Sequence, residues 1–382
     1  MIMPTLTPVQ VTLPESKEPT AKNVQDIIAT FLTREWPYVD IKALTVTYYK
    51  ATCTNLHVAV ERPPPTSIAA TEPLKVFIKF HDSNTEDVKI FKHLLPTEYE
   101  EMILCHEYSR FGLGVKVYGF FETQDGTIGR VDEFLDARNM EPEDVENSEI
   151  RADIARGLAA FHTMETSLPR NPVVSFYNAL MGGLEKYRGM DKLKALGKEG
   201  GVNVDNLIHY DLVGKLKRVV EKLKSLSAKE AWCIHDVQYM NVLVKKNPEE
   251  GESKITLIDF ELVMRNYRAF DIGGHFMQKM FKWFGVENKV ADCRKYTEKE
   301  KEHFCEEYAQ EWNKRTGDSD TGNQIFRESE YGYMLAIAFD LHNMLCFMAN
   351  EDDKDTLNLL ALNKLFHEFL GQYSRLGLEN IP

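Results

Sequence analysis

The hydrophobic pattern changes its period near residue 136, and this change constrains the fold of the 382-residue chain more than any other feature. Before this point, short runs of β-branched and aromatic residues are separated by turn residues, as is typical of strands. After it, apolar residues recur at helical spacing over long stretches. The sequence therefore predicts an α+β protein with a small β-rich N-terminal lobe at residues 21–135 and a large, mainly helical C-terminal lobe at residues 136–382.

The N-terminal lobe is expected to hold five strands, a first helix and one inserted helix. The strands are expected at residues 44–49, 56–60, 74–80, 115–121 and 128–134 and the helices at 21–36 and 97–111. The inserted helix starts at Thr97, which has the capping-box spacing to Glu100. Residues 1–20 show little periodicity, so a flexible arm is expected there.

The C-terminal lobe is expected to be helical apart from one group of short strands. Helices are expected at residues 150–162, 175–187, 211–226, 271–284, 297–312, 324–350 and 355–373, and short strands at 232–234, 242–244 and 255–258. The last two strands are predicted to form a hairpin.

Composition narrows the class of partner. The chain has 46 Lys and Arg against 59 Asp and Glu, and this net charge of −13 argues against a nucleic acid or an anionic membrane as its partner. The longest apolar segment, 331–348, contains Asp340, His342 and Asn343, so no membrane span is predicted. Six cysteines without a CxxC pair suggest a reducing compartment, and a cytoplasmic protein is expected.

Two polar clusters follow apolar strands of the C-terminal lobe. The first runs from Asp236 to Asn241, and the second begins at Asp259. Asn241 and Asp259 offer the oxygen ligands that Mg²⁺ prefers, while Asp236 is placed to accept a proton from a hydroxyl. This order matches the phosphoryl-transfer template of kinase-like, two-lobed folds. The alternative, in which Asp236 and Asp259 only cap turns, does not account for their order behind a β-rich lobe.

The same segments resemble a known family. Residues 255–261, followed by 266–276, resemble the signature of the choline/ethanolamine kinases, and Asp236, Gln238 and Asn241 are similar to the catalytic loop of that family. The resemblance covers about residues 40–375. It implies ATP and Mg²⁺ as cofactors, phosphorylation of choline or ethanolamine for phospholipid head-group synthesis, and a homodimer.

In the N-terminal lobe, Lys79 stands on an alternating strand and calls for an acidic partner. On the following helix, Glu101 shares a face with apolar residues, so the two are expected to pair. The resemblance implies that this pair holds the nucleotide phosphates. The alternative is a surface lysine on an edge strand.

Four further positions are expected to contact the nucleotide. The turn over the phosphates should lie at residues 50–55, where Thr52 and Asn55 are expected to take part, although the family's glycines are missing there. Adenine is expected to bind at residues 132–135, through Glu133 and Leu135.

The acceptor site departs from the family. The residues expected to contact the acceptor are Gln238, Glu261, Gln278, Trp283 and His342. Aromatic faces normally bind a quaternary ammonium, but Leu262 replaces a family tyrosine and Gln278 a family glutamate. Ethanolamine, which donates hydrogen bonds, is expected to be less affected than choline. Core packing is the alternative role for Trp283 and His342.

Three points stay open at this stage. His235 is displaced by one residue relative to the family's histidine, and a loop-stabilising role is preferred over a catalytic one. The acceptor is alternatively another small hydroxylated amine or a sugar on the same fold. A nucleotide-binding pseudo-kinase is the third alternative, and the retained set Asp236, Asn241 and Asp259 argues against it.

Overall fold

A computed structural model describes residues 5–50, 55–64, 71–81, 89–166, 168–169, 171–282, 293–349 and 356–380. The chain divides into two compact units. The smaller unit comprises Met1–Glu86, Pro96–Ala137 and Lys245–Asn247, and the larger one comprises Asp87–Leu95, Arg138–Val244 and Pro248–Pro382. Each unit is described by itself below.

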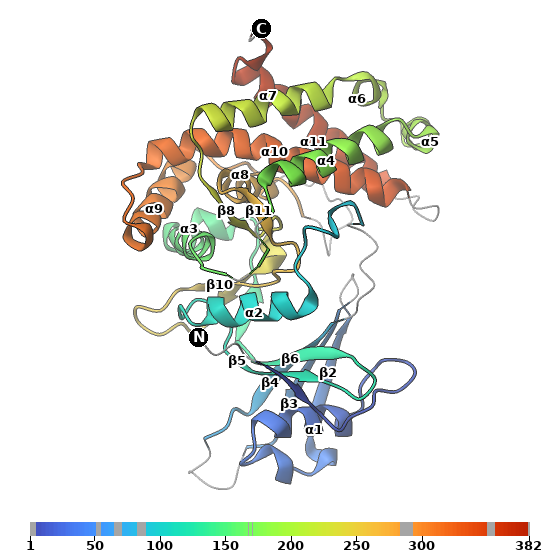
Figure 1. Cartoon of the computed structure of the whole chain (residues 1–382), viewed down its shortest axis with the longest axis vertical. Coiled ribbons are helices and arrows are strands. Elements are labelled where there is room, and N and C mark those ends of the chain that lie inside the picture. The colour runs from blue at the N-terminus through green and yellow to red at the C-terminus, as the bar shows by residue number, and fades with distance from the viewer. Residues whose placement is uncertain are drawn as a thin grey trace. The chain divides into compact units, whose positions relative to one another are not determined.

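The smaller unit is built on a six-stranded sheet (Figure 1). Its strands, in spatial order, are β1 (Leu6–Pro8), β5 (Val117–Glu122), β6 (Ile128–Glu133), β4 (Lys75–Phe80), β3 (Leu56–Glu61) and β2 (Thr45–Lys50). All neighbours are antiparallel except β1 and β5. The five predicted strands are therefore confirmed, and β1 is an addition.

The flexible arm expected at residues 1–20 is wrong for the described part, which starts at residue 5. Leu6 pairs with Phe120, so β1 forms the edge of the sheet. Val9, Val11 and Leu13 follow it and are each at most 7% exposed. Alternate apolar residues bury this segment, a period-two pattern too short to be recognised between its prolines.

Helices cover the two faces of this sheet. α1 (Ala21–Phe31) packs on the face that carries Ile78 and Phe121. α2 (Glu98–Ser109) places Met102 and Ile103 against Phe120, which points to the opposite face because side chains alternate along a strand. The capping box predicted at Thr97 and Glu100 is confirmed at the start of α2.

The larger unit is mainly helical. Its helices are α3 (Ser148–His162), α4 (Val173–Arg188), α5 (Asp191–Glu199), α6 (Asp205–His209), α7 (Leu212–Ser225), α8 (Ala269–Gln278), α9 (Glu298–Thr316), α10 (Gly322–Ala349) and α11 (Thr356–Arg375). Its short strands are β8 (Glu230–Cys233), β9 (Val242–Lys245), β10 (Ile255–Leu257) and β11 (Met264–Tyr267), and β7 (Ala137–Asn139) lies at the boundary and pairs with β9. The hairpin of β9 and β10 was predicted, whereas α5, α6, β7 and β11 were not.

Helix α10 is the core of the larger unit, with α4, α7, α8, α9 and α11 packed around it (Figure 1). It is long and apolar enough to cross a membrane by length and composition alone. However, 72% of its most apolar window is buried inside the structure, as in the core helix of a folded domain.

Two glycines set the distance between α8 and α10. A Cβ atom on Gly332 would lie 1.8 Å from the carbonyl oxygen of Ala269, and one on Gly273 would lie 2.1 Å from the backbone nitrogen of Tyr333. The two helix backbones therefore touch at this crossing. Neither contact involves a side chain that could turn aside.

Replacing Gly332 with alanine is expected to destabilise the protein. The new methyl group must push one backbone away from the other, and overpacking of this kind costs about 1–3 kcal/mol. Chemical denaturation measures the loss. Gly371→Ala on α11 is the control, because nothing lies within 4 Å of its Cβ position; it should be neutral or stabilising by up to about 1 kcal/mol. Equal behaviour of the two variants would contradict the close crossing.

Candidate active site

The loop between β8 and β9 brings three of the predicted site residues together. The Oδ2 atom of Asp236 accepts a hydrogen bond from Nδ2 of Asn241 at 2.8 Å and one from Nε2 of Gln238 at 3.0 Å. All three side chains are partly exposed. The carboxylate of Asp236 is therefore held in one orientation by two amides.

The β9–β10 hairpin brings Asp259 to the same place. Val242 pairs with Leu257, and the backbone nitrogen of Ile258 donates to the oxygen of Asn241 at 3.0 Å. Asp259 follows with φ = 65°, a left-handed conformation that a residue other than glycine seldom adopts. Such outliers cluster at functional sites.

The electrostatics of Asp236 agree with this closeness. Burial and the negative charge of Asp259 raise the pKa of Asp236, the bonds from Gln238 and Asn241 oppose the shift, and the pKa that results is about 6. The predicted convergence of Asp236, Asn241 and Asp259 is therefore what the larger unit shows.

The donor set fits Mg²⁺. The amide nitrogen of Asn241 donates to the backbone oxygen and the Oδ2 atom of Asp236. The amide oxygen of Asn241 therefore points away from that carboxylate. This oxygen and the carboxylate of Asp259 are one neutral and one anionic hard ligand. A cation there would also offset the repulsion between Asp236 and Asp259.

Helix α8 holds the backbone of the catalytic loop. Asp271, which is 1% exposed, accepts hydrogen bonds from the nitrogens of Ile234 at 2.6 Å and His235 at 2.9 Å. One turn later, Nδ1 of His275 lies 3.1 Å from the oxygen of Val237. Sequence reasoning gave Asp271 and His275 no role. Their spacing of four residues on an apolar helix was the available signal.

Asp271 also has a side-chain partner. Nε2 of His162 lies 2.9 Å from its Oδ2 atom, and Nδ1 of the same ring lies 2.7 Å from the hydroxyl of Tyr308. Cys233 completes a buried group that resembles a metal site by composition. The hydrogen bonds already engage both ring nitrogens and both carboxylate oxygens, so this group is structural.

His235 has the loop-stabilising contacts that were preferred for it. Its φ is 65°, its Nδ1 lies 2.9 Å from the oxygen of Cys233, and its Nε2 lies 2.9 Å from Nδ2 of Asn266. Burial lowers the pKa of His235 to about 4, so the ring stays neutral. With both ring nitrogens hydrogen-bonded, the neutral imidazole of His235 stabilises the loop.

Gln278 leads to a residue that sequence reasoning missed. Its Nε2 atom donates to Oδ2 of Asp340 at 2.9 Å, and Gln278 itself is 8% exposed. Burial, and to a smaller extent the charge of Asp236, raise the pKa of Asp340 to about 8, while the bond from Gln278 opposes the shift. Gln278 follows three residues after His275, which contacts the catalytic loop at Val237, so the pair of Gln278 and Asp340 lies next to the part of α8 that touches this loop. The sequence identified Asp340 only as an interruption of an apolar segment.

Two other predicted acceptor residues have different outcomes. His342 is fully buried, with its ring edge-on to Phe91 at 5.6 Å and to Tyr187 at 5.8 Å. It packs in the helical core, which agrees with the alternative role given for it, and its contact with the acceptor stays a prediction. Glu261 lies two residues after Asp259 and is partly exposed. Trp283 lies outside the described residues.

The predicted pair of the smaller unit is present. Nζ of Lys79 lies 2.8 Å from Oε1 of Glu101, and both side chains are 3% exposed. β4 lies between β3 and β6, so the alternative of an edge-strand lysine is wrong. The role of the pair in phosphate binding stays a prediction.

Two more basic side chains contact Glu101. Nη1 of Arg130 lies 3.3 Å from Oε1, and Nδ1 of His81 lies 3.2 Å from Oε2. Burial alone would raise the pKa of Glu101, but Lys79, His81 and Arg130 outweigh it and hold the pKa far below its usual range. Arg130, which also bonds Asp132 at 2.7 Å, was not predicted. It faces Lys79 across neighbouring strands.

The remaining nucleotide predictions are only partly within the described chain. Thr52 lies outside it, and Asn55, just before β3, is partly exposed. Oε1 of Glu133 accepts from the backbone nitrogen of Lys116 at 2.7 Å, so this side chain is engaged in the sheet. The oxygen of Leu135 accepts from the nitrogen of Ala137 at 3.0 Å. A contact of these residues with adenine stays a prediction.

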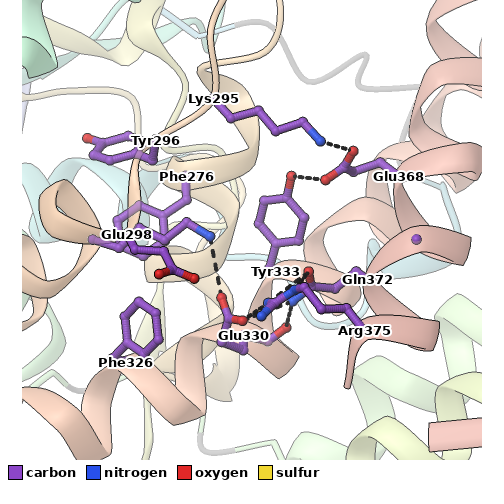
Figure 2. Close-up of a pocket in the computed structure, with 12 residues that line it drawn as sticks. Phe276, Lys295, Tyr296, Glu298, Phe326, Glu330, Tyr333, Glu368, Gln372 and Arg375 are labelled. Carbon is purple, nitrogen blue, oxygen red and sulfur yellow. Dashed lines mark hydrogen bonds and ion pairs between the residues drawn. The ribbon is translucent and has the colours of Figure 1, made fainter. Parts of the chain in front are cut away.

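A cavity of about 270 Å³ lies between α8, α9, α10 and α11, and none of the predicted site residues lines it (Figure 2). Figure 2 shows Lys295 and Tyr333 directed at Glu368, with the hydroxyl of Tyr333 2.9 Å from Oε1. Lys301 and Arg375 contact Glu330 in the same way. The contacts of Tyr333 with Glu368 and of Arg375 with Glu330 join α11 to α10, and Lys295 and Lys301 link the start of α9 to these two helices.

Replacing Glu101 with glutamine is expected to destabilise the smaller unit by about 3–5 kcal/mol, because Lys79 and Arg130 would stay buried without their counter-charge. Chemical denaturation measures this loss. The control is Glu107→Gln on the same helix, where the partner Arg110 is half exposed and the pair contributes under about 1 kcal/mol. Similar losses of stability in both variants would contradict a stabilising role for the buried charges around Glu101.

Replacing Asp340 with asparagine is expected to raise the melting temperature by an amount that grows between pH 5 and pH 8. The unfolded carboxyl group ionises near pH 4, whereas the folded pKa is about 8. The folded state thus holds a proton that the unfolded state releases, and the stability of the wild type falls as the pH rises. The variant lacks this loss.

The control for that experiment is Asp318→Asn. Lys229 and Trp312 hold the pKa of Asp318 at about 2, so this group stays ionised across the whole interval. The difference between this variant and the wild type should not change from pH 5 to pH 8. A constant difference for Asp340→Asn as well would contradict the raised pKa of Asp340.

Comparison with known proteins adds to this geometry. The model of the choline/ethanolamine kinase family matches residues 46–363. Mouse choline kinase alpha is 30% identical over 201 residues, which cover 51% of this chain and 42% of that protein. Human choline/ethanolamine kinase is 24% identical over 287 residues, which cover 74% of this chain and 68% of that protein. The match to the mouse protein thus spans less than half of its length.

Solved structures confirm the kinase-like fold. The choline kinase of Cryptosporidium parvum superposes with a TM-score of 0.65 at 13% identity, covering 93% of this chain and 97% of that one. LicA in complex with AMP superposes with a TM-score of 0.53 at 15% identity, covering 92% and 98%. The family model covers most of the chain, and the chain therefore belongs to the choline/ethanolamine kinase family.

Proposed function

We propose that the chain is an ATP-dependent kinase that phosphorylates the hydroxyl group of choline or ethanolamine and so supplies phospholipid head-group synthesis. The observation that carries this proposal is the 2.8 Å bond between Asp236 and Asn241 beside Asp259. A carboxylate for the hydroxyl and two oxygen ligands for a metal are the parts that phosphoryl transfer requires. Family membership supports the same reaction class.

In this proposal Asp236 orients the acceptor hydroxyl and takes its proton. Gln238 and Asn241 fix the carboxylate before the substrate arrives, because both donate to its Oδ2 atom. Asp271 and His275 keep the loop backbone in place from α8. Most of the rate enhancement would come from such placement and not from covalent catalysis.

The nucleotide would be ATP. Lys79, held by Glu101, would bind its phosphates, and the AMP complex of LicA supports nucleotide binding on this fold. Asn241 and Asp259 would hold Mg²⁺. When bound, the metal neutralises phosphate charge. Asp132 accepts a hydrogen bond from Arg130, the arginine beside Glu101, and so holds that guanidinium at the sheet.

The acceptor would be a cation. Asp236 and Glu261 belong to the larger unit, and their negative charge favours an amino alcohol over a neutral sugar. A cytoplasmic location and a homodimer are further predictions that accompany this function.

Replacing Asp236 with asparagine is expected to lower kcat by about 10²- to 10⁴-fold, the usual contribution of a general base. The assay follows phosphate transfer from ATP with Mg²⁺ to choline, ethanolamine and a set of sugars. Asp318→Asn, the same change at an exposed ion pair with Lys229, is the control and should keep full activity. Transfer to sugars alone would replace the proposed acceptor. Nucleotide binding without any transfer would indicate a pseudo-kinase.

A further inference from the structure

Asp340 is a carboxylate of the larger unit to which the reaction proposed above gives no role. We infer that Asp340 receives the cationic group of the acceptor, and that this group is an ammonium that carries N–H bonds. The inference rests on the proposed function, because the amine is taken to belong to the molecule whose hydroxyl is phosphorylated.

The position of Asp340 is well defined. Its Oδ2 atom accepts from Nε2 of Gln278 at 2.9 Å, and Gln278 is almost fully buried at the end of α8. The backbones of α8 and α10 touch at Gly273 and Gly332, so the two helices cannot shift easily. Asp340 itself is only partly buried, which leaves it open to a ligand.

The charge of Asp340 lacks a counter-charge. Its side chain bonds the neutral amide of Gln278, and among the described side chains no lysine, arginine or histidine forms an ion pair with it. A carboxylate in such a place is costly unless a cation joins it or a proton neutralises it. A ligand ammonium would relieve this cost and would lie close to the residue that acts on the hydroxyl.

The amide oxygen of Gln238, next to Asp236, also lacks a hydrogen-bond donor within the described part of the chain. The Nε2 atom of Gln238 donates to Asp236 at 3.0 Å, while its Oε1 atom is buried and accepts no hydrogen bond within the described part of the chain. Such an atom costs stability until a donor reaches it. Asp340 and Gln238 thus offer acceptors to one ligand.

The chemistry of these acceptors selects the ligand. A primary ammonium donates up to three hydrogen bonds, and each methyl group added to the nitrogen removes one donor. A quaternary ammonium donates none and relies on aromatic faces. His342 lies two residues after Asp340, and its ring was expected to contact the acceptor. The ring is buried against Phe91 and Tyr187 instead. The site is therefore suited to ethanolamine-like amines more than to choline.

A methylation series tests this inference by calorimetry. The full chain is titrated, without nucleotide, with ethanolamine, its N-methyl and N,N-dimethyl derivatives, and choline. Affinity should fall along the series, with a loss of at least about tenfold from ethanolamine to choline, as expected for hydrogen bonds to a charged group. In Asp340→Asn, the affinity for ethanolamine should fall by a similar factor while choline changes little, so the series becomes flat.

Asp318→Asn is again the matched control and should reproduce the wild-type series, because the side chain of Asp318 pairs with Lys229 and Trp312 and not with residues of the catalytic loop. Thermal denaturation verifies that both variants are folded. Choline binding as tight as ethanolamine, an unchanged series in Asp340→Asn, or no amine binding at all would each overturn the inference.

These outcomes are separable from the fate of the proposed reaction. Amine binding that depends on Asp340, without phosphate transfer to any hydroxyl, would remove the kinase proposal and keep the amine site. Phosphate transfer that depends on Asp236, together with amine binding that does not change in Asp340→Asn, would keep the kinase proposal and remove the amine site.

Discussion

The candidate active site depends on one buried carboxylate that touches the loop and not the proposed substrate. Asp271 accepts the backbone N–H groups of Ile234 and His235 and is itself held by His162. Without these bonds, the turn that presents Asp236 would have to satisfy two buried donors elsewhere. The left-handed backbone at His235 is tolerated because its surroundings determine it so completely.

Three buried or half-buried acids show how environment separates roles. Asp271 is satisfied by backbone donors and a histidine, which makes it a structural anchor. Glu101 is surrounded by Lys79, Arg130 and His81, which keeps it ionised inside the smaller unit. Asp340 has one amide and a neighbouring negative charge, so it alone of the three gains from an incoming cation. The same functional group thus serves as an anchor, a counter-ion and a candidate binding site.

Much of this could be predicted from the sequence, because the informative residues lie in local patterns. The partnership of Lys79 and Glu101 follows from an alternating strand and the apolar face of the next helix, and both patterns are short-range. Asp236, Asn241 and Asp259 lie on two loops joined by one hairpin, so their convergence needs only the register of β9 and β10. The pairing of β1 with β5 needed a contact over more than a hundred residues and was missed.

The acceptor side shows the limit of local reasoning. Asp340 and His342 stand two residues apart on one helix, so their spacing says only that they face different directions. Which direction leads to Gln278 and which to Phe91 is a matter of how α10 packs against its neighbours. Periodicity and spacing along the chain encode the two-lobed α+β plan, the pairing of Lys79 with Glu101 and the polar loop. The contact of Asp340 with Gln278 and the burial of His342 against Phe91 appear only in the folded chain, because packing between distant segments sets the rotation of a helix.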